Sequence, residues 1–271
     1  MRRSKQPLKL KESPLVMVLA QIRTSPVAKI SDYVPEVQER VRRRGFPRFV
    51  EGSTEEILLT PGGPPQLRVH PRWEFQDKDR TTGIIVSQNG VVVHTRRYDT
   101  FDAFAEHLKL ILGVVGDIVK PSLVERLGLR YVDLIRPQPG EAWTKYVKQG
   151  LHGIADGSVG MRSSLHRSEI VGDTEVGRLV VRGFQAADGS FLPPDLAPSS
   201  LDYSDVSLSA TETVTILDLD HYSEHAREYD ADQVLEYMWR LHDNLDLAFR
   251  ECVTEHALAR WKAEERKGGL R

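Results

Sequence analysis

One segment of the sequence, from Asp218 to His225, has the densest group of side chains that could bind a metal ion. Borderline metals such as zinc favour its mixture of carboxylate and imidazole groups. The segment therefore predicts one alternative activity, a metal-assisted hydrolase. The candidate catalytic groups are Asp218, Asp220, His221 and His225, and the candidate metal ligands are Asp220, His221 and His225.

The same segment also has a simpler interpretation as part of a strand. Side chains alternate between the two faces of a β-strand, so Asp218 and Asp220 would lie on one side and Leu217 and Leu219 on the other. A solvated strand face shows this pattern. No cysteine accompanies the histidines, and their spacing matches no established metal signature. We favour the solvated face.

A run of arginines in the range Arg40–Arg48 forms a second candidate site. Its guanidinium groups could contact phosphates, and Phe46 beside them could stack on a base, which predicts RNA or single-stranded DNA as an alternative ligand. Cations at the C-terminal end of a helix also complement the helix dipole, and this structural interpretation is the stronger one. The candidate nucleic-acid-binding residues are Arg42, Arg43, Arg44 and Arg48.

Other catalytic motifs are missing from the sequence. It has neither a glycine-rich phosphate loop nor a Gly-x-Ser-x-Gly motif. Ser163, Ser164 and His166 are close in sequence, but a catalytic triad depends on spatial geometry. Cys252 falls on the apolar face of a helical pattern, with no neighbour that would activate it. We therefore expect no cofactor and favour a protein without catalytic activity.

The composition is that of a globular protein. Of 271 residues, 40% are hydrophobic and 28% charged, so the chain can bury a core without disulfides, which its single cysteine could not form within one chain. The net charge of −2 argues against a generally basic, nucleic-acid-coating protein. No apolar stretch is long enough to cross a membrane and the start is charged, so we expect a cytoplasmic protein with no membrane partner.

The elements that position these residues follow from the hydrophobic pattern. An apolar strand over Pro14–Arg23 precedes a helix that Ser31 or Asp32 could cap and that Gly45 ends. Asn89-Gly90 predicts a tight hairpin between the last two strands of a run of four. A second helix follows, with an apolar stripe from Phe101 to Ile118. The four strands are expected at Glu56–Thr60, Gln66–Gln76, Thr82–Gln88 and Val91–Arg97.

This order of elements recurs in the second half of the chain, from the strand Leu127–Arg136 to a long helix that Asp230 or Asp232 could cap and that runs to about Lys262. Phe184-Gln185 further matches Phe75-Gln76. Five identities share an offset of 113 residues: Ile22 with Ile135, Arg23 with Arg136, Pro26 with Pro139, Tyr33 with Tyr146, and Val34 with Val147.

The repetition predicts an α+β protein made of two pseudo-repeated strand-helix-antiparallel strands-helix units. Such helix-grip or saddle-like units would form one continuous sheet with the long helices on one face. The first repeat would cover residues 1–125, the second 126–262, and a tail 263–271. A curved sheet of this kind leaves a concave polar face, or a pocket between sheet and long helix, as a binding surface.

Several short segments carry a resemblance to a known family: Pro14–Val16 with Gln21–Arg23, Arg126–Val132, Leu241–Phe249, and Val253–Glu255 with Trp261. They resemble an uncharacterised, sporadically distributed family of bacterial proteins, and the similarity spans nearly the whole chain. The resemblance implies an accessory gene, of the kind that often acts in defence or in toxin neutralisation. It transfers no catalytic residues.

Together these observations favour a non-enzymatic binding or regulatory protein. Its partner would be another protein, as for a neutralising or sensing component of an accessory defence or toxin-antitoxin system. Two linkers stand out, Thr60–Pro65 and the stretch Ala186–Ser207. The second is long for a compact domain and is therefore expected to be either functional or mobile. The apolar stripe of the last helix permits a homodimer, although core packing is the favoured use of that stripe.

Overall fold

The computed structural model describes residues 8–58, 63–154, 160, 166–186, 189–197, 199–209 and 212–263, with the backbone alone for 55–58. The α+β class is confirmed. The helices are α1 (Ile30–Arg42), α2 (Phe101–Ile118), α3 (Ala231–Cys252) and α4 (Glu255–Arg260). The strands are β1 (Leu15–Thr24), β2 (Arg48–Leu58), β3 (Gln66–Gln76), β4 (Thr82–Ser87), β5 (Gly90–Thr95), β6 (Leu123–Ile135), β7 (Arg167–Asp173), β8 (Arg178–Ala186), β9 (Val214–Ser223) and β10 (Arg227–Glu228).

All ten strands belong to one antiparallel sheet, in the order β2-β3-β4-β5-β1-β6-β9-β8-β7, with the short β10 paired to β6. The centre of the sheet is the pair β1–β6, in which Leu19 lies opposite Arg130. The edges are β2 and β7. One sheet therefore unites the two halves of the chain.

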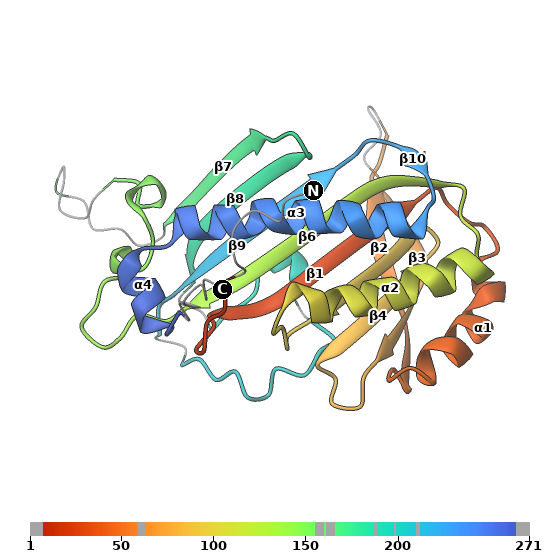
Figure 1. Ribbon diagram of the computed structural model, residues 1–271, viewed down its shortest axis with the longest axis horizontal. Helices are drawn as coiled ribbons and strands as arrows, with labels where there is room; N and C mark the ends of the chain where they lie inside the picture. The colour runs from red at the N-terminus through yellow and green to blue at the C-terminus, as the bar shows by residue number, and fades with distance from the viewer. Residues whose placement is uncertain are drawn as a thin grey trace, which may run out of the picture.

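The long helices cover one face of this sheet. In Figure 1, α3 and α2 cross the near face, and α1 lies beyond α2 at the end formed by β2, β3 and β4. The main core lies between this face and the helices, and includes Val18, Leu129 and Leu219 from the strands and Leu108 and Leu241 from the helices. The opposite face, the helix-free face, carries most of the polar side chains of the central strands.

The local signals in the sequence explain most element ends. Thr100 caps α2 by accepting a hydrogen bond from the Ala103 amide at 3.2 Å, and Asp230 caps α3 through the Gln233 amide at 2.9 Å. Gly90 takes a φ of 133°, and an added Cβ would lie 2.1 Å from the Ile22 carbonyl oxygen. Only glycine fits this position, where β5 passes close to β1. The predicted hairpin is present, but its two turn residues are Gln88 and Asn89, and Gly90 is already the first residue of β5.

Three predicted boundaries are wrong. Helix α1 begins at Ile30 after Lys29, without a side-chain cap, so neither Ser31 nor Asp32 caps it. Strand β2 begins at Arg48, well before the expected Glu56. The last helix does not run to Lys262, because α3 ends at Cys252 and Thr254 caps the separate helix α4.

The predicted repeat is also wrong in two respects. Among the described residues no α-helix follows the first strand of the second half, where only the short 3-10 helices Trp143–Lys145 and Gln149–Leu151 lie. One marker pair of the repeat also fails. Phe75 lies on β3 in the core beneath the helices, whereas Phe184 lies on β8 in a smaller cluster on the helix-free face. The two phenylalanines therefore lie on opposite faces of the sheet. The stripe of α3, including Val234, Met238 and Leu245, is buried in the core. No helix in the described part of the chain is long and apolar enough to cross a membrane.

Candidate functional site

The helix-free face contains a chain of ion pairs across β6, β9 and β8, with the buried Asp218 at its centre. Asp218, with 0% of its surface exposed, receives hydrogen bonds from Arg130 and, at 3.1 Å, from Nη1 of Arg182. Arg130 also donates to Asp195 at 2.5 and 3.1 Å, and Arg182 donates to Glu169 at 2.6 Å. Each arginine lies between two carboxylates, so the network leaves neither guanidinium without an internal partner.

The pKa values follow from this arrangement. Burial opposes the charge on Arg130, but the hydrogen bonds that it donates to Asp195 and Asp218 outweigh burial and raise the pKa of the guanidinium. The hydrogen bond from Arg130 lowers the pKa of Asp195. Both groups stay charged at neutral pH. The network stabilises this face of the sheet, and its charged groups are already paired with one another rather than available to a ligand.

The structure separates the residues of the segment Asp218–His225. Asp218 and Asp220 share the helix-free face, as alternation predicts, but Asp218 is buried and not solvated. His221 lies on the other face, where its Nε2 and the Thr174 hydroxyl are 3.0 Å apart and its Nδ1 is 3.3 Å from the Leu241 carbonyl oxygen. His225 follows the end of β9. Among the residues with a described position, no group of three or more His, Cys, Asp or Glu could hold a metal ion.

The arginine run at the end of α1 is paired mostly within its own helix. Arg42 and Arg43 both form ion pairs with Glu39, and Arg48 donates from Nε to the Lys78 carbonyl at 2.9 Å. Phe46 is 2% exposed and lies against His107, so it offers no surface for a base. The predicted stacking role of Phe46 is wrong. Arg44 follows at the exposed end of the helix.

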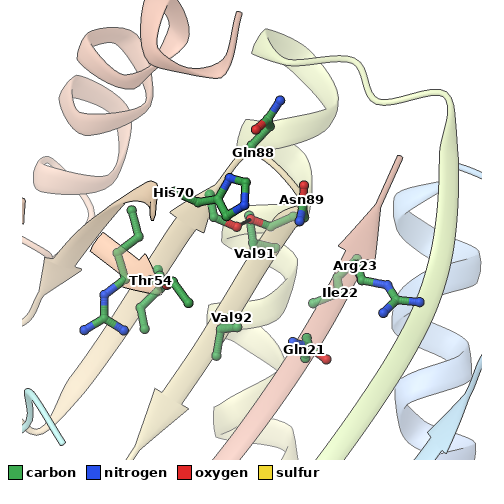
Figure 2. Close-up of a pocket in the computed structure, with 13 residues that line it drawn as sticks. Gln21, Ile22, Arg23, Thr54, His70, Gln88, Asn89, Val91 and Val92 are labelled. Carbon is green, nitrogen blue, oxygen red and sulfur yellow. Dashed lines mark hydrogen bonds between the residues drawn. The ribbon is translucent and has the colours of Figure 1, made fainter. Parts of the chain in front are cut away.

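A different basic site lies at the other end of the helix-free face. A pocket of about 420 Å³ opens there between the hairpin of β4 and β5 and its neighbouring strands. Figure 2 shows Gln21 and Arg23 of β1 on one side, Thr54 and His70 of β2 and β3 on the other, and Gln88 and Asn89 at the turn. We call it the anion pocket; its described lining is Gln21, Ile22, Arg23, Thr54, His70, Arg72, Ile85, Ser87, Gln88, Asn89, Gly90, Val91 and Val92.

The sequence builds this pocket by alternation. Side chains of β3 alternate between the two faces of the sheet. Trp73 and Phe75 are buried beneath the helices, so His70 and Arg72 point to the helix-free face. On β1, Gln21 and Arg23 alternate with the buried Ile22 in the same way. The tight turn before Gly90 lets the β4–β5 hairpin pack against β1. The polar side chains of β1 and those of β3 therefore line one hollow.

The charge of the anion pocket is not balanced. Its described lining contains two guanidinium groups and one imidazole, and no carboxylate. Arg23 has Glu125 at 3.8 Å, with both side chains largely exposed. Arg72 forms no ion pair within the described part of the chain. The pocket therefore presents hydrogen-bond donors and positive charge to a ligand, above an apolar floor that includes Ile85 and Val92.

A second pocket of about 420 Å³ on the same face surrounds the Arg130 network. Its three arginines, Arg130, Arg167 and Arg182, face the carboxylates of Glu169, Asp195 and Asp218. It differs from the anion pocket because internal ion pairs already occupy its charged groups. Only Arg167, whose guanidinium lies over the Phe184 ring at 5.5 Å, has no carboxylate partner in the described chain.

The segment between β8 and β9 is packed over the remaining part of the face. It runs along the lower edge of Figure 1, drawn in cyan. The Ser200 hydroxyl donates to Glu74 Oε1 at 2.5 Å, and Arg96 donates to Asp205 at 2.5 and 2.7 Å. Tyr203 donates to the Val16 carbonyl at 3.2 Å. We call residues 189–209 the strap; it leaves the anion pocket uncovered.

Some predicted features fall elsewhere. Ser163 and Ser164 lie outside the described residues, as do parts of the linker Thr60–Pro65, and His166 contacts the Leu151 carbonyl oxygen at 2.7 Å. Sequence reasoning missed His70 and Arg72. Their signal was the alternation of polar residues along Gln66–Gln76 opposite Trp73 and Phe75.

Comparisons with known proteins give no further guide, because no family model, no curated protein and no solved structure matches this chain.

Proposed function

We propose that this is a non-enzymatic binding protein that takes a small anionic ligand, bearing a phosphate or carboxylate group, in the anion pocket. The observation that carries the proposal is the lining itself: Arg23, Arg72 and His70 line one hollow, and its described lining contains no carboxylate. Guanidinium groups bind phosphate and carboxylate through paired, charge-assisted hydrogen bonds. Two guanidinium groups at one hollow complement such an anion.

The rest of the pocket supports a metabolite-sized ligand. Its volume of about 420 Å³ is within the usual range for small-molecule sites. The amides of Gln21, Gln88 and Asn89 and the hydroxyls of Thr54 and Ser87 can donate or accept further hydrogen bonds. The apolar floor offers a surface for a ring or chain, so a ligand with one acidic and one apolar end fits best.

The proposal includes a sensing role. The pocket is lined by residues of β1, β2, β3 and the β4–β5 hairpin, so a bound anion would join strands that are distant in sequence. A ligand that binds only the folded chain stabilises it by mass action. Such a sensor matches the accessory defence or toxin-antitoxin role that the family resemblance implies.

We also infer that the chain arose by internal duplication. Outward from the central pair, β1 is followed by β5, β4 and β3, and β6 is followed by β9, β8 and β7. In each half the first strand pairs with the last full-length strand before the long helix. Arg23 and Arg136 each have a carboxylate nearby, Glu125 at 3.8 Å and Glu212 at 3.7 Å.

A protein partner is the second candidate ligand, and the exposed edge of the sheet favours it. Ile170 and Val171 on the edge strand β7 are 51% and 54% exposed. An edge strand has unpaired backbone groups that can accept a strand from another chain. A substitution of Val171 by Lys would then prevent capture of that partner while anion binding persists.

Thermal denaturation in the presence of small ligands tests the main proposal. Inorganic phosphate, a nucleoside monophosphate and a dicarboxylate are compared with the neutral nucleoside, all at one ionic strength set with chloride. At roughly one hundred times the dissociation constant, a bound ligand adds about 2.7 kcal/mol to the free energy of unfolding. At least one anion should raise the melting temperature and the neutral analogue should not. If none does, the proposal fails.

A further inference from the structure

A third hollow lies on the opposite side of the sheet, between β6, α3 and the N-terminal residues. It has a volume of about 100 Å³. Leu8, Leu10 and Leu15 form its apolar wall, and Tyr98, Tyr131 and Phe249 supply aromatic faces. Because the sheet separates it from the anion pocket, whatever it binds is independent of the function proposed above. We call it the Asp133 pocket.

The carboxyl group of Asp133 is the unusual feature of this pocket. Asp133 is 2% exposed, and its Oδ2 atom is buried with no hydrogen-bond partner in the described chain. A buried polar atom without a partner costs free energy, so natural proteins rarely keep one unless a ligand or ordered water completes it. Asp133 also lines the hollow, so a molecule inside it can reach the carboxyl group.

The other polar side chains of the pocket are two carboxylates, three hydroxyl groups and one imidazole. Asp99 and Asp246 line it together with Asp133, and no lysine or arginine does so among the residues described. The Tyr131 hydroxyl is 2.7 Å from Nδ1 of His242 and 3.2 Å from the Tyr98 hydroxyl. Burial lowers the pKa of His242 to about 4, so this imidazole is neutral at physiological pH.

We propose that the Asp133 pocket binds a small organic cation, a primary amine with a short apolar chain, whose ammonium group is received by Asp133. Carboxylate and aromatic faces are the two groups that bind ammonium ions in proteins. An apolar cavity of about 150 Å³ holds one benzene molecule, so this smaller hollow fits an amine of about four or five heavy atoms. A longer chain would extend toward the exposed rim at Ser13 and Asp99.

The charged and titratable groups around Asp133 come from every element packed against it. Asp99 is paired with Lys9 at 2.8 Å, and Asp246 with Arg250 at 2.8 Å, so both rim carboxylates are already partly neutralised. Asp133 has no such partner among the residues that the structure describes. The described groups around it are Lys9 and Asp99 at the rim, Tyr98 before α2, Tyr131 on β6, Asp218 on β9, and His242, Asp246, Arg250 and Cys252 on α3.

Because of these neighbours, the proposed binding of an ammonium ion should depend on pH. Burial, and then the charge of Asp218, raise the pKa of Asp133 to about 8, so the empty pocket holds a neutral acid at neutral pH. An ammonium ion requires the carboxylate, and its binding therefore releases a proton. Affinity should rise roughly tenfold per pH unit from about pH 6 to about pH 8 and then level off. The pKa of His242 lies below this window, and burial raises that of Cys252 to about 11, above it.

Calorimetric titration of the full chain with n-butylammonium chloride tests the proposal, with n-butanol and butyrate as neutral and anionic analogues. Butylammonium should bind, more tightly at about pH 8 than at about pH 6 by up to a hundredfold, with proton release. Asp133→Asn should remove the binding. Asp220→Asn, which alters a carboxyl group on the other face, should leave it unchanged.

Several outcomes would overturn the proposal: no heat of binding at millimolar butylammonium, butanol binding as well as the amine, or Asp133→Asn binding like the original protein. The first of these would mean that ordered water alone fills the pocket. If Asp133→Asn does not fold, the pH dependence and the comparison with butanol in the unaltered protein still decide.

Discussion

Arg130 on β6 donates two hydrogen bonds to Asp218 on β9, from Nε to Oδ1 at 2.7 Å and from Nη2 to Oδ2 at 2.8 Å. Both residues lie at the centre of the sheet, on the face without helices. A paired guanidinium and carboxylate in this position cost desolvation, and their geometry offsets that cost. The pair therefore helps to hold β6 and β9 together in their register on the helix-free face.

Substitution of Asp218 by Asn should destabilise the protein strongly. It leaves the buried guanidinium of Arg130 and the partly exposed one of Arg182 with one carboxylate fewer, and loss of one partner of a buried pair costs about 3–5 kcal/mol. Chemical denaturation measures this free energy. Replacing both Arg130 by Met and Asp218 by Leu should cost much less, because the two buried charges are removed together. Arg182 then keeps Glu169, and Asp195 is largely exposed. Equal losses in the single and double variants would contradict the assignment.

The stability of the protein should depend on pH through Asp133. Its pKa is about 8 in the folded chain and 3.8 ordinarily, so the folded state holds a proton that the unfolded state releases. This stabilisation is complete below about pH 4 and is lost as pH rises toward 8, by up to about 1.4 kcal/mol per pH unit. Urea denaturation across this range should show the slope, and Asp133→Asn should reduce it. Parallel profiles for the two proteins would refute the prediction.

Glu74 should act in the opposite direction, at acid pH. Burial alone would raise its pKa, but hydrogen bonds with His94, Ser200 and Gln76 outweigh burial and hold the pKa at about 2. The stabilisation by the Glu74 carboxylate is therefore present above about pH 4.5 and is lost as pH falls toward 2. Acid denaturation followed by circular dichroism should be less steep for Glu74→Gln. An unchanged acid transition would mean that these hydrogen bonds contribute nothing.

The strap should loosen without loss of the fold when Arg96 is changed. Arg96 pairs with Asp205, donates to the Asp202 carbonyl at 2.5 Å, and lies over the Tyr203 ring at 5.0 Å. In Arg96→Gln, amide hydrogen exchange should increase within residues 189–209 and stay unchanged in α3. Arg178→Gln on the same face is the control, because its exposed pair with Asp173 does not touch the strap. Equal exchange in all three proteins would exclude the anchoring role.

Local chemistry in the sequence predicts a large part of the fold. The stripe of α2 and the strand Gln66–Gln76 each follow from residues within one element, and each is confirmed. The hairpin predicted from Asn89-Gly90 is also present, with its turn one residue earlier, at Gln88 and Asn89. The end of α3 could not be predicted this way. Val253 and Trp261 continue the apolar pattern and are both buried, although the backbone leaves the helix between them. The spacing of apolar residues shows which side chains are buried, and here the buried positions continue past the end of the helix.

The candidate site was less accessible to sequence reasoning. Asp218 and Asp220 alternate with leucines as an exposed face would, but their partners Arg130 and Arg126 come from β6, far along the chain. Arg72 is the opposite case. Nothing in its local sequence marks it, and it becomes a candidate binding residue because no carboxylate in the described chain pairs with it. Pairing across a sheet decides both outcomes, and no local pattern records which strands become neighbours.

The most direct test of the central claim is calorimetric titration of the protein and its Arg72 variants with a nucleoside monophosphate and with inorganic phosphate. Arg72→Gln should weaken binding about tenfold or more, because a hydrogen bond to a charged group contributes about 1.5–3 kcal/mol. Arg72→Lys should fall between, since it keeps the charge and loses the paired geometry. Arg178→Gln, outside the anion pocket, should bind like the unaltered protein. Equal affinity of Arg72→Gln and Arg178→Gln for these anions would contradict anion binding in this pocket.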